Sequence, residues 1–393
     1  MLAAGRPVKP GGWRLSPART GNGLHLADLA AICAIVIGSQ AAIATPPSQR
    51  LDHVHGLRGI AALAVVFQHA CQMVREGGHT VFDPLLDTIN LGRFGVVLFF
   101  LISGLVIPFS FKGARPLRNF VVSRLFRLYP AYWLSIPVLS WVAAVKGYPP
   151  GFATILGNLT MMQGFWGGWN IGPGYWTLNY EMGFYVLCAL LVALRLLGDP
   201  RVIGALVLVA LVLALLPFAS GLGTIREMPF FIGIFLLGTL LRAAFADGSI
   251  AARRWALLLV PLAMATGIVL GGAFVPVPNN ANVYFKPLAL ASSMSLPIAV
   301  FVAVLWLKPR PGRVAMYLGT ISYSLYLFQD IGLHVLPHVL SPRDWPMTYM
   351  AAVFALTLVV AALVYRFVEA PMIAIGRRLA HPAPAGPGKA AAG

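Results

Sequence analysis

The 393-residue chain is 59% hydrophobic and only 10% charged, with a formal net charge of +17. Soluble domains are usually about a quarter charged, so this balance, with a mean hydropathy of +0.79, excludes a soluble globular protein. Long continuous apolar runs also exclude a transmembrane barrel, and they predict an all-α, polytopic bundle of membrane-spanning helices. In such a protein, the positive charge indicates basic cytoplasmic loops and anionic lipid rather than nucleic acid.

The first 50 residues are a leader whose status the sequence leaves open. A basic stretch precedes an apolar one, and Ala42-Ile43-Ala44 has the form of a signal cleavage site. Cleavage of a signal would place Thr45 outside and invert the charge bias of the rest of the chain. An uncleaved eleventh span would leave the N-terminus outside. We therefore expect a disordered or interfacial leader, or a start assigned too far upstream.

Ten apolar segments follow the leader, and each is expected to cross the membrane as a helix. They cover residues 57–76, 92–111, 128–146, 174–197, 202–220, 228–246, 255–275, 286–307, 314–336 and 348–369. The short apolar segment 152–166 is expected in an outer loop, lying in the interface or re-entering the membrane.

The loop charges predict the orientation of these spans. If the first span starts in the cytoplasm, the inner loops and tail carry seventeen lysines and arginines, against six on the outer side. The positive-inside rule then places both ends of the membrane core, residues 51–375, in the cytoplasm. Residues 376–393 are low in complexity and are expected to form a disordered cytoplasmic tail.

The first span carries an arginine at its start and a histidine further along. Arg58 and His69 are eleven residues apart, which puts both side chains on one helical face, roughly 16 Å apart along the axis. That spacing suits one long ligand, or two ligands that meet from opposite ends. A neutral histidine that bonds a neighbouring helix, and an arginine that only fixes topology, are the structural alternatives.

A basic segment precedes the third span. Arg124 and Arg127 stand at i and i+3, so both guanidinium groups lie on one helical face and could hold phosphates. Ordinary topology charge is the alternative. In the second span, Ser103-Gly104 indicates close helix packing or a bend beside a ligand tunnel.

The fourth span carries a carboxylate among aromatic residues, in GYWTLNYEMGFY. Glu181 lies near the outer third of this span, where an acidic group should be paired or line a cavity. It could form a structural ion pair, orient His69, or bind an acceptor.

Metal binding has little support in the sequence. His53 with His55, and His334 with His338, lack a third ligand at suitable spacing, and the three cysteines form no CxxC motif. No metal is expected. Asp330 and Glu369 are expected near span ends, where water or a loop arginine can reach them.

Six segments together resemble the acyltransferase 3 family of integral-membrane O-acyltransferases. They occur in the family's order and read GLRGIAALAVVFQHA (56–70), GRFGVVLFFLISGLVI (92–107), NFVVSRLFRLYPAYWL (119–134), GYWTLNYEMGFYVL (174–187), ISYSLYLFQ (321–329) and YRFVEAPM (365–372). An arginine followed by ten residues and a histidine, and an Arg-x-x-Arg before the third span, match the family's pattern. The fourth segment is similar to acetyltransferases that modify bacterial exopolysaccharides of the succinoglycan type.

The chain departs from this family in two places. Members often carry His and Trp after SYSLYL, where this chain reads Phe328-Gln329-Asp330, so no role of that histidine carries over. Some members also have a C-terminal esterase-like domain, whereas this chain is expected to be the membrane domain alone.

The resemblance implies a multi-pass O-acyltransferase, most simply an O-acetyltransferase of a bacterial inner membrane. The donor would be cytoplasmic acyl-CoA, expected to be acetyl-CoA, with its phosphates on Arg58, Arg124 and Arg127 and Arg118 as a weaker contact. His69 would be the general base, Glu181 its positioning partner, and Ser103 the nucleophile if an acyl-enzyme forms.

The acceptor would be a polysaccharide or lipid-linked sugar. It would approach the outer loop, where stacking is expected on the aromatic residues Trp166, Trp169 and Tyr175. A transporter or flippase of a glycan, and a non-enzymatic partner of a polysaccharide synthase, are the alternatives.

Overall fold

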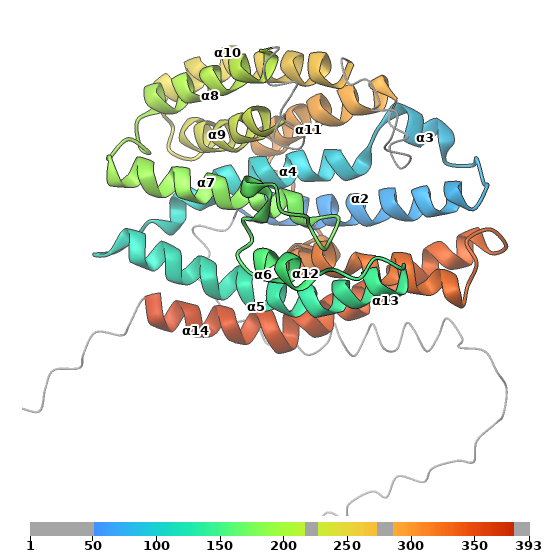
Figure 1. Ribbon diagram of the computed structural model, residues 1–393. Helices are drawn as coiled ribbons and strands as arrows, with labels where there is room; N and C mark the ends of the chain where they lie inside the picture. The colour runs from blue at the N-terminus through green and yellow to red at the C-terminus, as the bar shows by residue number, and fades with distance from the viewer. Residues whose placement is uncertain (1–50, 217–226, 273–285, 381–393) are drawn as a thin grey trace, which may run out of the picture. The chain divides into compact units, whose positions relative to one another are not determined.

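The computed structural model describes residues 51–216, 227–272 and 286–380, and within these ranges it contains helices, turns and loops but no strand (Figure 1). The expected leader at 1–50 and residues 381–393 lie outside the described residues. The predicted all-α fold class is confirmed.

Each of the ten expected spans coincides with a long helix. These helices are α2 (Asp52–Glu76), α4 (Leu91–Val106), α5 (Pro116–Val145), α7 (Tyr175–Ala193), α8 (Pro200–Leu215), α9 (Met228–Phe245), α10 (Ile250–Gly272), α11 (Pro287–Leu307), α12 (Arg313–Val335) and α13 (Pro346–Val364). Eight helical stretches of the described residues are long and apolar enough to cross a membrane. Helix α8 is shorter but apolar, and α12 has 23 residues but is more polar.

Short elements connect and extend these helices. They are α3 (Asp83–Thr88), the 3₁₀ turns η2 (Ile107–Ser110), η3 (Gln163–Trp166) and η6 (Leu336–His338), α6 (Phe152–Asn158), the π-helical turn η7 (Tyr365–Glu369) and α14 (Ala370–Ala380). The apolar segment 152–166, expected in an outer loop, contains a short helix and a 3₁₀ turn.

Two helices extend more than ten residues beyond the expected spans. Helix α5 begins at Pro116 rather than near residue 128, with proline at a first-turn position where its missing N–H costs nothing. The basic segment is therefore helical and continuous with the third span. The last span continues through η7 and α14 to Ala380, into the segment expected to be a disordered tail.

Glycines let three helices pack with their backbones in contact. A side chain at Gly59 of α2 would lie 2.5 Å from the backbone nitrogen of Gly319 on α12, and one at Gly95 of α4 would lie 2.6 Å from the carbonyl of Ala61. Helices α2 and α12 are parallel, because Gly56 near the start of α2 meets Pro311 just before α12, and His69 further along α2 interacts with His334 near the end of α12. Such small residues are what close helix packing in membranes requires.

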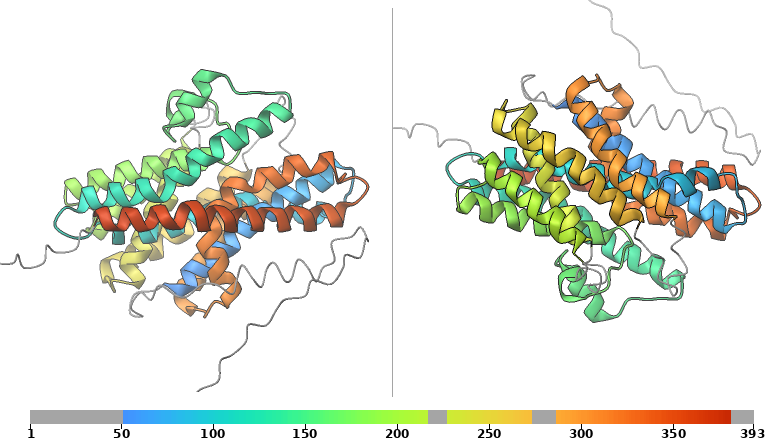
Figure 2. Two further views of the ribbon diagram at one scale, coloured as in Figure 1. Left: turned by 90° about the horizontal axis from the view of Figure 1, so that it is seen from below. Right: turned by 90° about the horizontal axis from the view of Figure 1, so that it is seen from above.

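The remaining helices extend this core on both sides. Helix α9 runs parallel to α4, because Arg93 pairs with Glu227 at 2.6 Å near their starts and Thr239 donates to the Gly104 carbonyl near their ends. Helices α8 and α10 pack against α9, and α11 packs against α4 and α10, while α5, α13 and α14 lie on the other side of α2 and α4 (Figure 1). Figure 2 shows α14 lying along α5.

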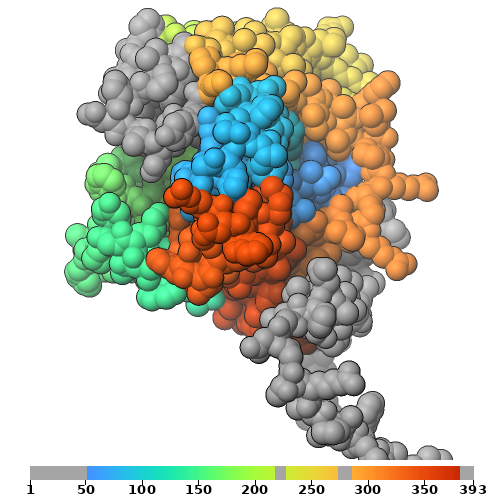
Figure 3. All heavy atoms as spheres, turned by 90° about the vertical axis from the view of Figure 1, so that its right-hand side faces the viewer, coloured from blue at the N-terminus to red at the C-terminus, as the bar shows by residue number. Residues whose placement is uncertain are grey.

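The two ends of this bundle are named here by their connections. The α3 end carries α3 and the α12–α13 connection (336–345), which face the viewer in Figure 3. The opposite, α4–α5 end carries the α4–α5 and α7–α8 connections (Figure 1).

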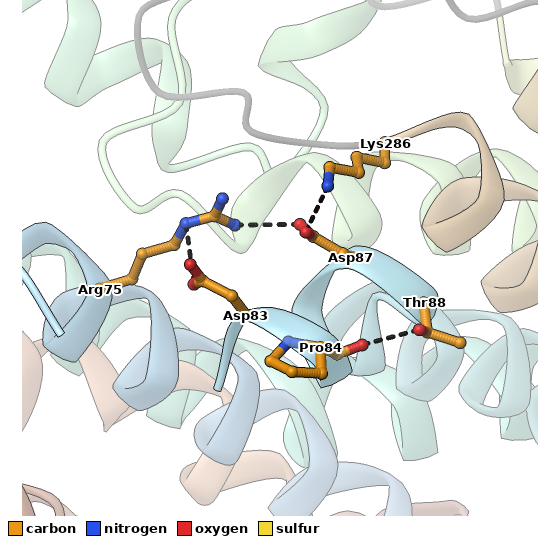
Figure 4. A network of polar contacts seen from close by, with 6 residues as sticks. All are labelled: Arg75, Asp83, Pro84, Asp87, Thr88 and Lys286. Atoms are coloured by element: carbon orange, nitrogen blue, oxygen red, sulfur yellow. Dashed lines mark hydrogen bonds and ion pairs between the residues drawn. The ribbon is translucent and has the colours of Figure 1, made fainter. Parts of the chain in front are cut away.

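An ionic network holds α3 against the bundle (Figure 4). Arg75, in the last turn of α2, contacts Asp83 at 3.2 Å and Asp87 at 3.4 Å, and Lys286 before α11 also donates to Asp87. The hydrogen bond from Lys286 holds the pKa of the Asp87 carboxyl below its ordinary value. The network thus ties the end of α2 to the start of α11 through α3.

Candidate functional site

The structure brings together the three arginines that the sequence nominated for phosphate binding. Arg58 lies in the second turn of α2, and Arg124 and Arg127 lie on α5. Arg127 interacts electrostatically with both Arg58 and Arg124. We call these three residues the arginine cluster. Arg118, the weaker candidate, is exposed and donates to the Leu379 carbonyl at 3.4 Å, apart from the cluster.

Arg124 is held between rings and keeps unused donor capacity. Its guanidinium lies 5.8 Å from the Phe120 ring centroid and 5.7 Å from that of Tyr185, and one Nη donates to Ser110. Its Nε is buried without a hydrogen-bond partner among the described residues. Aromatic faces of this kind orient a guanidinium without neutralising its charge.

Glu181 belongs to the surroundings of the arginine cluster. Its Oε1 accepts from Tyr185 at 2.6 Å and from Ser103 at 3.2 Å, and the carboxylate interacts electrostatically with Arg58 and Arg124. A carboxylate at membrane depth is expected to have such partners.

The depth predicted for Glu181 needs correction. Glu181 lies level with Ser103, near the α4–α5 end of α4, rather than in the outer third of a span. The reason is that α7 starts beside the middle of α5, where the Tyr175 hydroxyl lies 2.6 Å from Ser135.

A second carboxylate, which sequence reasoning placed within reach of water or a loop arginine, is also beside the cluster. Glu369 is only 3% exposed, accepts a hydrogen bond from Ser324 of α12, and interacts with Arg58 and Arg127. It ends the π-helical turn η7, which the sequence does not reveal. Its segment, YRFVEAPM, was recognised only as part of the family resemblance.

His69 lies about three turns further along α2 than Arg58, roughly 16 Å away along the axis. Its Nδ1 is 3.0 Å from Oε1 of Gln72, one turn later on α2. Because that oxygen only accepts, this contact favours the tautomer with the proton on Nδ1 and a lone pair on Nε2. Among the described residues, His69 and Glu181 are not hydrogen-bonded to each other. Gln72, the partner of His69 in the structure, was not predicted from the sequence.

The three aromatic residues expected to stack on a sugar differ in their exposure. Trp166 and Trp169 are 59% and 83% exposed, whereas Tyr175 is 1% exposed. Tyr175 cannot present a face to a sugar, because its ring packs on Tyr132 and its hydroxyl bonds Ser135.

His55, the possible metal ligands and a surface cavity are not part of the candidate site. His55 contacts the Met316 carbonyl and Thr320 of α12, which accounts for it structurally. Among the described residues, no three His, Cys, Asp or Glu side chains gather closely enough for a metal ion. A cavity of about 320 Å³ between α9, α10 and α11 contains none of the candidate residues.

Comparison with known proteins identifies a family for this chain. The family model described as an acyltransferase domain, acyltransferase 3, matches residues 51–366. Nodulation protein 10 of Rhizobium leguminosarum bv. viciae is 26% identical over 355 residues, which cover 80% of this chain and 91% of that protein. Acyltransferase MdmB of Streptomyces mycarofaciens is 28% identical over 150 residues, 36% of this chain and 39% of that protein.

No solved structure matches the chain. The family match covers the described bundle almost completely, from the start of α2 to η7, and includes His69, Glu181 and all three residues of the arginine cluster. The chain therefore belongs to the acyltransferase 3 family, and it is a multi-pass membrane acyltransferase.

Proposed function

We propose that this acyltransferase moves an acyl group, in the first instance acetyl, from cytoplasmic acyl-CoA to a hydroxyl group of a surface or exported polysaccharide or a lipid-linked sugar. A bacterial inner membrane is the expected location. The observation that carries the proposal is the arginine cluster at the α4–α5 end of the bundle.

The charge balance of the cluster favours an anionic ligand. Within the described part of the chain, three guanidinium groups interact with two carboxylates, Glu181 and Glu369, so one positive charge of the cluster is left without a counter-charge. Like charges held together at membrane depth are costly unless an anion joins them. The phosphates of CoA would supply that anion, and the free Nε of Arg124 supplies a donor for one of them.

The sidedness of the charges supports a cytoplasmic donor. The excess of basic residues in the connections at the α4–α5 end marks that end as cytoplasmic under the positive-inside rule. Acyl-CoA bound there would extend its pantetheine arm along α2, which places the thioester towards His69, roughly 16 Å from Arg58.

His69 is the proposed general base. The acceptor hydroxyl gives its proton to Nε2 as its oxygen attacks the thioester carbonyl, and Gln72 holds the proton on Nδ1. A carbon–oxygen ester bond forms, the carbon–sulfur bond breaks, and the CoA thiolate leaves and takes up the proton that His69 accepted, which regenerates the neutral base. A direct transfer of this kind needs no covalent enzyme intermediate.

Glu181 has a supporting role in this scheme. Its hydrogen bonds to Tyr185 and Ser103 and its proximity to the arginines suit a residue that positions the cluster and the donor. An acyl-enzyme on Ser103, with Glu181 accepting the hydroxyl proton, is the second mechanism that this contact permits.

The test compares glycans and thiol release in one set of strains. A strain lacking the gene is complemented with the wild type, His69→Ala or Arg124→Ala at matched membrane abundance. We expect the wild type alone to restore a base-labile O-acyl group on envelope or extracellular glycan. Membranes should release thiol from acetyl-CoA only with the wild type at low donor concentration. Glycan export that depends on the gene without thiol release would instead identify a transporter.

A further inference from the structure

A second polar group lies on α12, away from the arginine cluster. Asp330 and His334 are one turn apart, and His334 Nε2 is 3.9 Å from Asp330 Oδ1. Their side chains are 8% and 21% exposed, so a carboxylate and an imidazole are largely buried in the bundle. At 3.9 Å the two atoms are too far apart for a direct hydrogen bond.

This pair lies level with His69. Helices α2 and α12 are parallel and in contact through Gly59 and Gly319, so residues further along each helix remain side by side. His334 interacts electrostatically with His69. The pair follows the SYSLYL segment, at the place where the chain departs from the family's sequence pattern.

The hydrogen-bonding capacity of these side chains is unfilled. Among the described residues, neither Asp330 nor His334 makes a side-chain hydrogen bond. Gln329, 3% exposed, has a buried Oε1 without a partner. Buried polar groups are costly unless they are paired, so their side chains call for a polar ligand.

The neighbours of the pair indicate the direction from which that ligand comes. Asp330 interacts electrostatically with Tyr175, at the start of α7, and with Lys146, which is exposed at the end of α5. His334 lies one turn nearer the α3 end than Asp330. A ligand that enters from the α3 end therefore meets this pair on its way to His69, opposite the arginine cluster.

We propose that Asp330 and His334 form the acceptor subsite. They would bind hydroxyl groups of a polyhydroxylated acceptor, a sugar, adjacent to the hydroxyl that His69 deprotonates. The proposal rests on the proposed function. A carboxylate accepts hydrogen bonds from two neighbouring hydroxyls, and the imidazole can donate or accept one more. The pair fixes which hydroxyl reaches the base and takes no part in bond making.

The experiment separates acceptor binding from donor binding. Full-length protein in proteoliposomes is given acetyl-CoA and the glycan fraction of the gene-deletion strain, freed of esters by mild alkali, and thiol release is measured while each substrate is varied. The variants are Asp330→Asn and His334→Gln. Asp344→Asn and His338→Gln, at exposed positions beyond the subsite, are the matched controls.

The subsite predicts that each variant raises the half-saturating glycan concentration about tenfold, the scale of one lost hydrogen bond to a charged group. Half-saturation by acetyl-CoA should stay within about twofold of wild type, and the controls should match wild type in both. Should Asp330→Asn fail to accumulate, His334→Gln carries the test, because its side chain is the more exposed.

Two outcomes overturn the proposal, and they are distinguishable. If the wild type transfers acetyl but both variants keep the wild-type half-saturation for glycan, or lose donor and glycan affinity equally, the pair is structural. If the wild type releases no thiol with any glycan fraction, the proposed function itself fails and the acceptor subsite fails with it.

Discussion

Replacing Arg124 with alanine tests the donor site most directly. In the structure its Nη2 donates to the Ser110 hydroxyl and its side chain also bonds the Tyr185 hydroxyl, both neutral groups, while its Nε has no partner among the described residues. One charge-assisted hydrogen bond to a phosphate contributes about 1.5–3 kcal/mol. Its loss should raise the half-saturating acyl-CoA concentration by roughly 10- to 100-fold. The turnover number should change little, because Arg124 does not contact the reacting thioester in this scheme.

The assay is thiol release from acetyl-CoA by proteoliposomes, with S-acetyl-pantetheine as a donor that lacks the phosphates. Arg124→Ala should be impaired with acetyl-CoA and close to wild type with the truncated donor. Arg118→Ala is the control, because Arg118 lies on the same helix but is exposed and contacts only the Leu379 carbonyl. The half-saturating acetyl-CoA concentration of Arg124→Lys should lie between those of the wild type and Arg124→Ala, since lysine keeps the charge but loses the planar guanidinium group.

An equal penalty with both donors would refute this reasoning. It would mean that Arg124 acts through its packing against Phe120 and Tyr185 rather than through phosphate. The same conclusion would follow if Arg118→Ala raised the half-saturation as much as Arg124→Ala does.

Three further predictions concern other parts of the bundle. Gln72→Leu should lower the turnover number about five- to tenfold at unchanged acetyl-CoA half-saturation, since His69 loses the acceptor that fixes its tautomer; an unchanged turnover would separate Gln72 from the base. Ser103→Ala should keep activity within about fivefold, whereas an acyl-enzyme would require a loss of roughly 1000-fold and ping-pong kinetics. Asp87→Asn should lower the thermal midpoint at neutral pH. The hydrogen bond from Lys286 lowers the pKa of Asp87 in the folded protein. The difference in thermal midpoint between wild type and variant should therefore be largest above the ordinary pKa of 3.8, and it should shrink as the pH falls below that value. Melting curves of both proteins at neutral pH and below pH 3.8 measure this difference. A difference that stays constant with pH would contradict the ionic role of Asp87.

The sequence predicts what depends on one helix at a time. Apolar length predicts the ten helices, and helical spacing puts Arg124 with Arg127 and aligns Arg58 with His69. Pro116 carries the signal for the early start of α5, but a basic segment beside a membrane is read more readily as a loop.

Contacts between distant helices could not be predicted in this way. Glu369 meets Ser324 only because η7 turns it inward, and Tyr326 reaches Thr177 across 149 residues of sequence. The depth of Glu181 likewise depends on how far the loop before α7 folds into the bundle. Hydrophobic periodicity reports which face of a helix is buried, but it does not report which helix covers that face.

The packing of α2 on α12 explains how the two substrates could be kept in register. Gly59 and Gly319 bring the two backbones into contact, so the helices cannot slide without a clash between main chains. Arg58 and His69 are fixed on one of these helices and the Asp330–His334 pair on the other. The separation of the phosphate-binding end from the base, and of the base from the acceptor subsite, is therefore set by helix geometry rather than by flexible loops. A donor and an acceptor that enter from opposite ends would then meet at His69 without a large rearrangement of the bundle.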